Sequence, residues 1–223
     1  MKTLILNGSP RKKGVTTQML KIMEEKAREK GTVEHIRIYD CDITPCAGCM
    51  GCRPDKKCLL PQDDGHRIAR LIDEADLLIL SSPTYWGNIS GPLKTVLDRC
   101  VTTFEYLDGH RFPKRLQKGK RALIVTASSA PIGYHLLPSQ SNGAVRAMKT
   151  VLKAGGYNIK GVLNIPDSNR FEEKKEGFTL QAKGLVNRAL KGYSEPTVRR
   201  FPHEKGSAAR LRRQGDVLRT RVG

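Results

Sequence analysis

The sequence has no long apolar run, and this absence excludes a membrane-spanning protein. None of its apolar stretches approaches the ~20 residues that a bilayer crossing needs. Neither G-x-G-x-x-G nor G-x-x-x-x-G-K-S/T occurs anywhere in the 223 residues, which excludes a Rossmann dinucleotide fingerprint and a Walker phosphate loop. No secretory leader is recognisable, because Met1 and Lys2 lead into a short apolar stretch that stops at Gly8.

Charge is abundant and mainly positive, since 40 Lys and Arg stand against 22 Asp and Glu. Residues 197–223 are particularly basic and poor in large apolar side chains. We therefore expect a globular domain over residues 1–192 and a basic extension over residues 193–223. A nucleic-acid arm is the alternative for this extension, but no nucleic-acid motif accompanies the charge and aromatic residues make up only 5%.

Alternating strand and helix patterns predict an α/β fold. Apolar runs indicate five strands, at residues 3–6, 33–38, 77–80, 122–125 and 159–165. Helical apolar stripes follow them, over residues 16–30, 68–75, 93–100, 144–152 and 182–190. Three of the strands are almost entirely apolar, which is typical of a parallel sheet covered on both faces. We therefore predict a doubly wound sheet whose ligands bind beyond the carboxyl ends of its strands.

The loop between the first predicted strand and helix, residues 7–17, has the composition of an anion site. Backbone amides at a helix N-terminus lack acceptors, and the helix dipole favours negative charge there. The loop also offers hydroxyl donors and positive charge, from Ser9, Thr16, Thr17, Arg11, Lys12 and Lys13. We expect it to bind a phosphate group. The alternative is a capped helix preceded by a basic loop.

The loop after the third predicted strand, residues 81–92, contains the only Trp of the chain. Large aromatic side chains such as Tyr85 and Trp86, at the end of a sheet, are typical of a site for a flat ligand. Alternatively, these two residues only cover the end of the sheet. Ser90 is expected to cap the next helix.

The stretches GSPRKKGVTTQML and SSPTYWGNISGPLKTVLDR, in this order, resemble the flavodoxin-like NAD(P)H-dependent FMN reductase family. The resemblance covers residues 1–190 and implies a flavodoxin-like five-stranded sheet of order 2-1-3-4-5, FMN as cofactor and a homodimer or tetramer. By position it implies contacts with the FMN phosphate from Ser9, Arg11, Thr16 and Thr17. It also implies contacts with the flavin ring, from Pro83, Thr84, Tyr85, Trp86, Gly87, Asn88, Ser128 and Ser129.

Four cysteines form a second motif, Cys46-x2-Cys49-x2-Cys52-x5-Cys58. Such compact spacing suits a 4Fe–4S cluster, whereas zinc usually takes two knuckles set farther apart. The motif is similar to that of iron–sulfur flavoproteins, a branch of this fold in which a cluster passes electrons to FMN. Reduced thiols, a redox disulfide, zinc and simple packing are the alternatives. Cys100 lies on an apolar helix face and is expected in the core.

Together with these patterns, the resemblance implies an FMN-dependent oxidoreductase that accepts hydride from NAD(P)H and passes electrons to a small molecule or a protein. No catalytic side chain is predicted, because the flavin carries the redox chemistry. One alternative is an iron–sulfur flavoprotein that relays single electrons from a ferredoxin-like donor; another is a nonenzymatic binding module that uses the basic tail. Cysteines without a leader indicate a reducing cytoplasm. In the insertion at residues 102–120, His110 and Arg111 are candidates for nicotinamide cofactor phosphates, with a solvated loop as the alternative.

Overall fold

A five-stranded sheet lies at the centre of the computed structural model, which describes residues 1–53, 55–107 and 112–192. Its strands are β1 (Lys2–Asn7), β2 (Thr32–Arg37), β3 (Leu77–Pro83), β6 (Arg121–Ala127) and β7 (Asn158–Ile165). They pair in the order β2-β1-β3-β6-β7, and every pair is parallel. The predicted order 2-1-3-4-5 is thereby confirmed, with β6 and β7 as the fourth and fifth strands. The expected basic extension, His110 and Arg111 lie outside the described residues.

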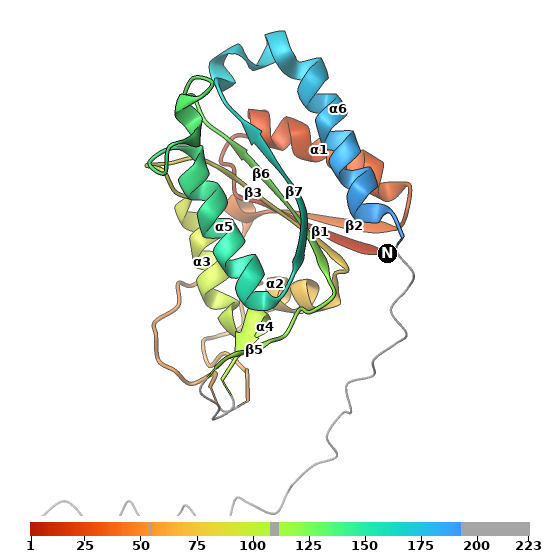
Figure 1. Cartoon of the computed structure of the whole chain (residues 1–223). Helices are drawn as coiled ribbons and strands as arrows, with labels where there is room; N and C mark the ends of the chain where they lie inside the picture. The colour runs from red at the N-terminus through yellow and green to blue at the C-terminus, as the bar shows by residue number, and fades with distance from the viewer. Residues whose placement is uncertain (54, 108–111, 193–223) are drawn as a thin grey trace, which may run out of the picture. The chain divides into compact units, whose positions relative to one another are not determined.

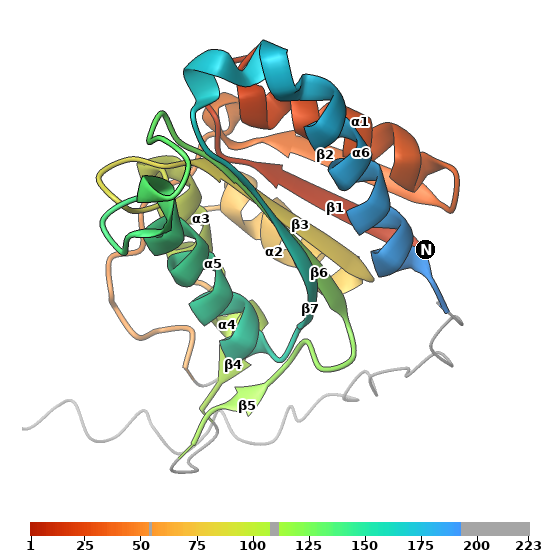
Figure 2. The same cartoon turned by 45° about the horizontal axis from the view of Figure 1, so that its top comes forward.

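Helices cover both faces of the sheet (Figures 1 and 2). One face carries α1 (Val15–Arg28) and α6 (Phe171–Leu190). The other carries α2 (Asp64–Glu74), α3 (Gly91–Arg99), the single-turn α4 (Val101–Phe104) and α5 (Ser141–Gly155). The described residues also form three short 3-10 helices: η1 (Ile38–Asp40), η2 (Tyr134–Leu136) and η3 (Ser168–Arg170). Among the helices of the described ranges, none is both long and apolar enough for a membrane crossing.

The strands β1, β3 and β6 are apolar on both faces because each face of the sheet has its own core. In β3, Leu78 and Leu80 join the core beneath α2, α3 and α5, whereas Leu77 and Ile79 join the core beneath α1 and α6. All four side chains are fully buried. Successive residues of a strand point to opposite faces, so an unbroken apolar run is what a central strand between two helical layers requires.

The insertion at residues 102–120 contains regular structure in its described parts, residues 102–107 and 112–120. Its strands β4 (Glu105–Tyr106) and β5 (Lys114–Arg115) pair antiparallel. Gln117 then anchors the segment, because its buried Nε2 donates to the carbonyl of Thr103 at 2.6 Å and to Asp73 Oδ1 at 2.7 Å. Two-residue strands show no periodicity in the sequence, so the pattern predicts neither of them.

Candidate functional site

The loop between β1 and α1 is fixed to two neighbouring elements. The amide of Gly8 donates to the carbonyl of Ser81 at 2.8 Å, and the hydroxyl of Ser90 donates to the carbonyl of Gly8 at 2.8 Å. A Cβ on Gly8 would lie 2.9 Å from both the Ser81 oxygen and Ser90 Oγ, so the close approach requires glycine. Ser90 does occupy the N-cap position of α3. Its hydroxyl, however, holds the β1–α1 loop instead of capping that helix, which corrects the expectation.

Helix α1 presents an open N-terminus to this loop. Across the residues that the structure describes, no side chain caps it at Gly14, and its first turn contains no acidic residue. The first amides of a helix have no intrahelical acceptor and carry partial positive charge. Arg11, Lys12 and Lys13 are exposed along the preceding loop. This end of α1 therefore offers both hydrogen-bond donors and positive charge to an anion.

The predicted hydroxyl residues Ser9, Thr16 and Thr17 are all buried in the loop. Thr17 Oγ1 donates to the carbonyl of Arg11 at 2.9 Å, and Ser9 Oγ accepts the Arg11 amide at 3.3 Å. Two of the three hydroxyls thus shape the loop itself, which no sequence pattern reveals. Contacts of these residues and of Arg11 with a phosphate stay a prediction.

A series of linked polar side chains supports the loop from the elements beneath it. Asn7 Oδ1 accepts the Ser9 amide at 3.0 Å, and Asn7 Nδ2 donates to Thr17 Oγ1 at 3.2 Å. Asn7 Nδ2 also lies 3.5 Å from His35 Nε2, and His35 Nδ1 lies 2.6 Å from Glu24 Oε2. Sequence reasoning missed His35 and Glu24, because they are 11 residues apart and belong to different elements.

The Glu24–His35 pair makes stability depend on pH. Burial raises the pKa of Glu24, but hydrogen bonds from His35 and Arg28 outweigh it, and the net pKa is lowered. A lowered carboxyl pKa stabilises the fold above the unfolded-state pKa of about 4.3, and this stability is lost as pH falls through the folded pKa. Glu24→Gln should therefore lower the free energy of unfolding by about 1 kcal/mol at pH 7 and by much less at an acidic pH below the lowered folded-state pKa.

Urea unfolding at both pH values measures this difference. Glu25→Gln, at the exposed neighbouring position, is the control and should change little at either pH. An equal loss at both pH values for Glu24→Gln would contradict the assignment.

The loop after β3 forms a two-residue turn that displays Trp86. The amides and carbonyls of Tyr85 and Asn88 bond reciprocally at 2.9 Å, and Trp86 and Gly87 have φ values of 51° and 68°. Positive φ at both central positions defines a type I′ turn, which is strained for Trp. Trp86 is fully exposed, with a relative accessibility of 103% for the whole residue. Trp86 therefore does not cover the end of the sheet.

The other predicted ring contacts lie in the same loop or in the loop after β6. The amide of Thr84 donates to the carbonyl of Ala127 at 2.9 Å, which joins the turn to the last residue of β6, just before the loop that contains Ser128 and Ser129. Ser128, in that loop, is buried, and its Oγ has no hydrogen-bond partner within the described ranges. Ser129 beside it is exposed. A buried hydroxyl without a partner is unfavourable, so Ser128 Oγ is available to a polar atom of a ligand.

The four motif cysteines are free thiols on one loop between η1 and α2. Cys46 and Cys49 are exposed, and Cys52 and Cys58 are half-buried. Burial raises the pKa of the Cys52 thiol, and charge on the other three thiols raises it further, so Cys52 lies within electrostatic range of each of the other three. Within the described residues, no group of three or more His, Cys, Asp or Glu side chains is arranged to hold a metal.

Two aspartates anchor this loop at the start of α2. Asp63 caps the helix, with a capping box to His66. Asp63 Oδ2 also accepts the amide of Thr44 at 3.1 Å, and Asp64 Oδ2 accepts the amide of Asp42 at 3.0 Å. These bonds hold the beginning of the cysteine loop against its end.

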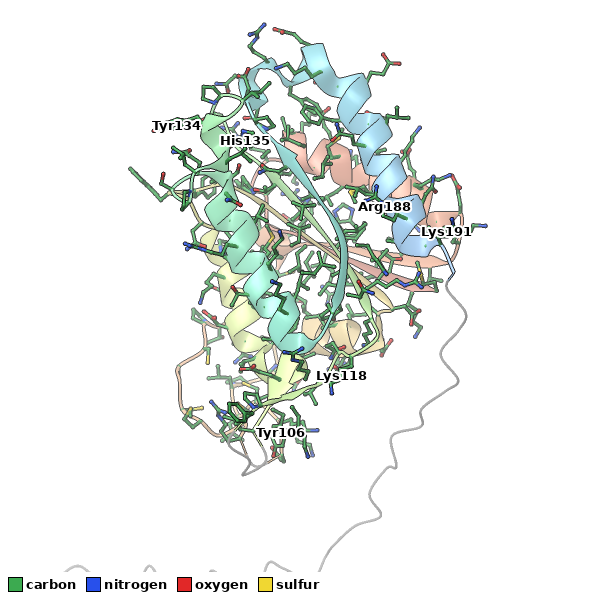
Figure 3. The ribbon with its side chains drawn as sticks, viewed as in Figure 1. Tyr106, Lys118, Tyr134, His135, Arg188 and Lys191 are labelled. Carbon is green, nitrogen blue, oxygen red and sulfur yellow. The ribbon has the colours of Figure 1, made fainter. Side chains whose placement is uncertain are left out.

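The cysteine loop lies near the end of α5 that is farther from η2. Figure 3 shows Tyr134 and His135 of η2 near one end of α5 and Tyr106 near the other end. Lys56 of the cysteine loop places its Nζ 4.9 Å from the centre of the Tyr106 ring. The Thr102 hydroxyl also donates to the Lys56 carbonyl at 3.2 Å. The inserted segment thus packs against the cysteine loop.

Cys100 differs from the motif cysteines, as expected, because it is buried at 1% exposure. Burial raises the pKa of Cys100 to about 12. Since the thiolate is the reactive form, we expect iodoacetamide to alkylate native Cys100 more than about 1000-fold more slowly than the exposed Cys46 of the metal-free protein. Peptide mass spectrometry after timed labelling measures both rates. Equal labelling in the native state would contradict the burial, and labelling of Cys100 in urea is the control.

Comparisons with known proteins agree with this arrangement. The family described as NADPH-dependent FMN reductase matches residues 1–160. An iron–sulfur flavoprotein of Archaeoglobus fulgidus is 36% identical over 228 residues, which cover 98% of this chain and 94% of that protein. Another, from Methanocaldococcus jannaschii, is 38% identical over 100 residues, covering 44% of this chain and 51% of that protein. In this second alignment the chain spans about half of its relative's length.

Among solved structures, an FMN-dependent NADH-azoreductase of Bacillus anthracis in complex with FMN superposes with a TM-score of 0.68. The sequences are 16% identical, and the match covers 84% of this chain and 99% of that one. At this identity the likeness shows a shared fold alone. The family match and the alignment along nearly the whole chain go further: this chain belongs to the NADPH-dependent FMN reductase family and resembles its iron–sulfur flavoprotein branch.

Proposed function

We propose that this chain binds FMN and acts as an NAD(P)H-dependent FMN oxidoreductase that passes electrons to a small-molecule or protein acceptor. The observation that carries this proposal is the uncapped N-terminus of α1 behind a basic loop, together with a strained turn that displays Trp86 after the neighbouring strand β3. Bound FMN supplies hydride and electron transfer, and the protein supplies position and charge. The flavin-binding domain is proposed to span residues 1–192.

The residues present fit FMN at both of its ends. The phosphate would meet the first amides of α1 together with Ser9, Arg11, Thr16 and Thr17, where the free donors and the positive charge suit a dianion. The ring would lie against the turn of residues 83–88 and the loop with Ser128 and Ser129. The unpartnered Oγ of Ser128 supports this placement, because a polar ring edge would satisfy it.

The relation to iron–sulfur flavoproteins favours a second cofactor on the cysteine loop. We propose that Cys46, Cys49, Cys52 and Cys58 hold a 4Fe–4S cluster. Four free thiols on one loop are the donor set that such a cluster takes, although the sulfurs must converge from their described positions. The proposed partners are NAD(P)H as a transient co-substrate, a ferredoxin-like protein where the cluster relays single electrons, and further copies of this chain.

Anaerobic purification followed by flavin, iron and acid-labile sulfide analysis tests both cofactors together. We expect about one FMN and about four iron and four sulfide per chain, and the flavin absorbance should bleach when NADPH or NADH is added. A colourless protein that does not bind added FMN would overturn the proposal. Flavin without iron and sulfide would overturn the cluster alone. Cys46→Ser should lose the iron and keep the flavin, whereas Cys100→Ser should keep both.

A further inference from the structure

Arg99, the last residue of α3, is a buried charge beside the cysteine loop. Its side chain is 2% exposed. Burying an unpaired guanidinium is strongly unfavourable, so such a group is normally paired and hydrogen-bonded. The partners of Arg99 therefore indicate what this position is built to hold.

One side of the guanidinium is fully satisfied by a carboxylate. Arg99 Nη2 donates to Asp63 Oδ1 at 2.9 Å and to Oδ2 at 3.1 Å. Gly65 lets the start of α2 come this close, because a Cβ there would lie 3.2 Å from Arg99 Nε. Since Asp63 also binds the amide of Thr44, two residues before Cys46, this ion pair ties Arg99 to the beginning of the cysteine loop.

The other side of the guanidinium is directed at sulfur. Arg99 Nη1 donates to Cys58 Sγ at 3.0 Å, and Arg99 Nε has no hydrogen-bond partner among the described residues. A neutral thiol is a weak acceptor, so it compensates a buried cationic donor poorly. A thiolate, by contrast, would make this a charge-assisted bond. The pairing is thus favourable when the Cys58 sulfur is negative, as it is in a metal ligand.

We propose that Arg99 is a positioning residue that holds the Cys58 sulfur in place as a cluster ligand and stabilises the negative charge on it. This inference rests on the proposed cluster. Hydrogen bonds to ligand sulfurs and nearby charge set the potential of iron–sulfur clusters. A fixed cation at Cys58 favours the reduced, more negative cluster and so raises its reduction potential. The alternative is that Arg99 only pairs with Asp63 to hold α2 against α3.

The test is a redox titration of the anaerobically reconstituted holoprotein, in which electron paramagnetic resonance measures the reduced cluster at each potential. Arg99→Gln removes the charge, and Arg99→Lys keeps the charge without the planar fork. Arg70→Gln makes the same charge change at an exposed position of α2 and is the control. Arg99→Gln should lower the reduction potential of the cluster. At the potential where the wild-type cluster is half reduced, we therefore expect the oxidised cluster of Arg99→Gln to outnumber the reduced cluster at least about tenfold. Arg99→Lys should fall between Arg99→Gln and the wild type.

Loss of iron to a chelator is the second readout, with FMN content and circular dichroism as the checks on folding. Both Arg99 variants should lose iron faster than Arg70→Gln while they keep their flavin. If Arg99→Gln does not fold, Arg99→Lys decides the question by its iron loss and its potential. A wild-type potential together with wild-type iron retention would overturn the role of Arg99 and leave the cluster intact. A wild-type protein that takes up no iron and sulfide would overturn both proposals.

Discussion

Arg11→Glu is expected to weaken FMN binding by more than about 100-fold and to leave riboflavin binding nearly unchanged. Arg11 is exposed on the loop before α1, and its backbone rather than its side chain makes the bonds that shape the loop. The substitution therefore changes charge without dismantling the loop. Two unit charges about 4 Å apart near a protein surface interact by about 4 kcal/mol, and each 1.4 kcal/mol corresponds to about tenfold in affinity.

Flavin fluorescence titration measures both affinities. Riboflavin lacks the phosphate, so the comparison separates the phosphate end of the site from the ring end. Lys21→Glu reverses an exposed charge farther along α1 and should change FMN affinity only slightly. If Arg11→Glu weakened FMN and riboflavin equally, the β1–α1 loop would not be the phosphate site.

Gly143→Ala is expected to destabilise the fold by about 3 kcal/mol and to weaken flavin binding at least about tenfold. A Cβ on Gly143 would lie 2.0 Å from the carbonyl oxygen of Gly87 and 2.4 Å from that of Pro138. Both contacts are with backbone, so the methyl group can be accommodated only if the turn that carries Trp86 moves. The same displacement would disturb the proposed ring site.

Gly91→Ala is the matched control for this substitution. Among the described atoms, nothing lies within 4 Å of a Cβ at Gly91, in the first turn of α3. Alanine there should be neutral or stabilise by up to about 1 kcal/mol, because glycine loses more backbone entropy on folding. Urea unfolding and flavin titration compare the two variants. Equal stability and equal affinity would show that the contact between α5 and the turn is unimportant.

The sheet could be predicted from the sequence because its strands leave a strong pattern. The run at residues 77–80 is apolar throughout, and it lies in the central β3 as expected. The apolar stripe predicts helix α6 only over residues 182–190, because the first half of the helix is mostly polar and contains Gly177. The helix begins at Phe171. Apolar periodicity therefore predicts whether a segment is a helix or a strand. It does not predict where an element begins or ends when the terminal residues lack the pattern.

The candidate site, too, could be predicted from the sequence only in part. The positions of its loops follow from the alternation of strands and helices, because parallel strands bring their carboxyl ends to one edge. The bonds that hold these loops join distant residues: Ser90 and Gly8 are 82 residues apart, and Arg99 and Cys58 are 41 apart. No local pattern contains such pairs, so only the folded structure reveals them.

Helix α3 connects the two proposed cofactor sites, since Ser90 at its N-cap bonds Gly8 and Arg99 at its last position bonds Cys58. Its nine residues, at about 1.5 Å per residue, make it a spacer of about 13 Å. One added or deleted residue would rotate one end by about 100° relative to the other and separate Ser90 or Arg99 from its partner. The length of this helix is therefore constrained more tightly than the identity of its exposed side chains.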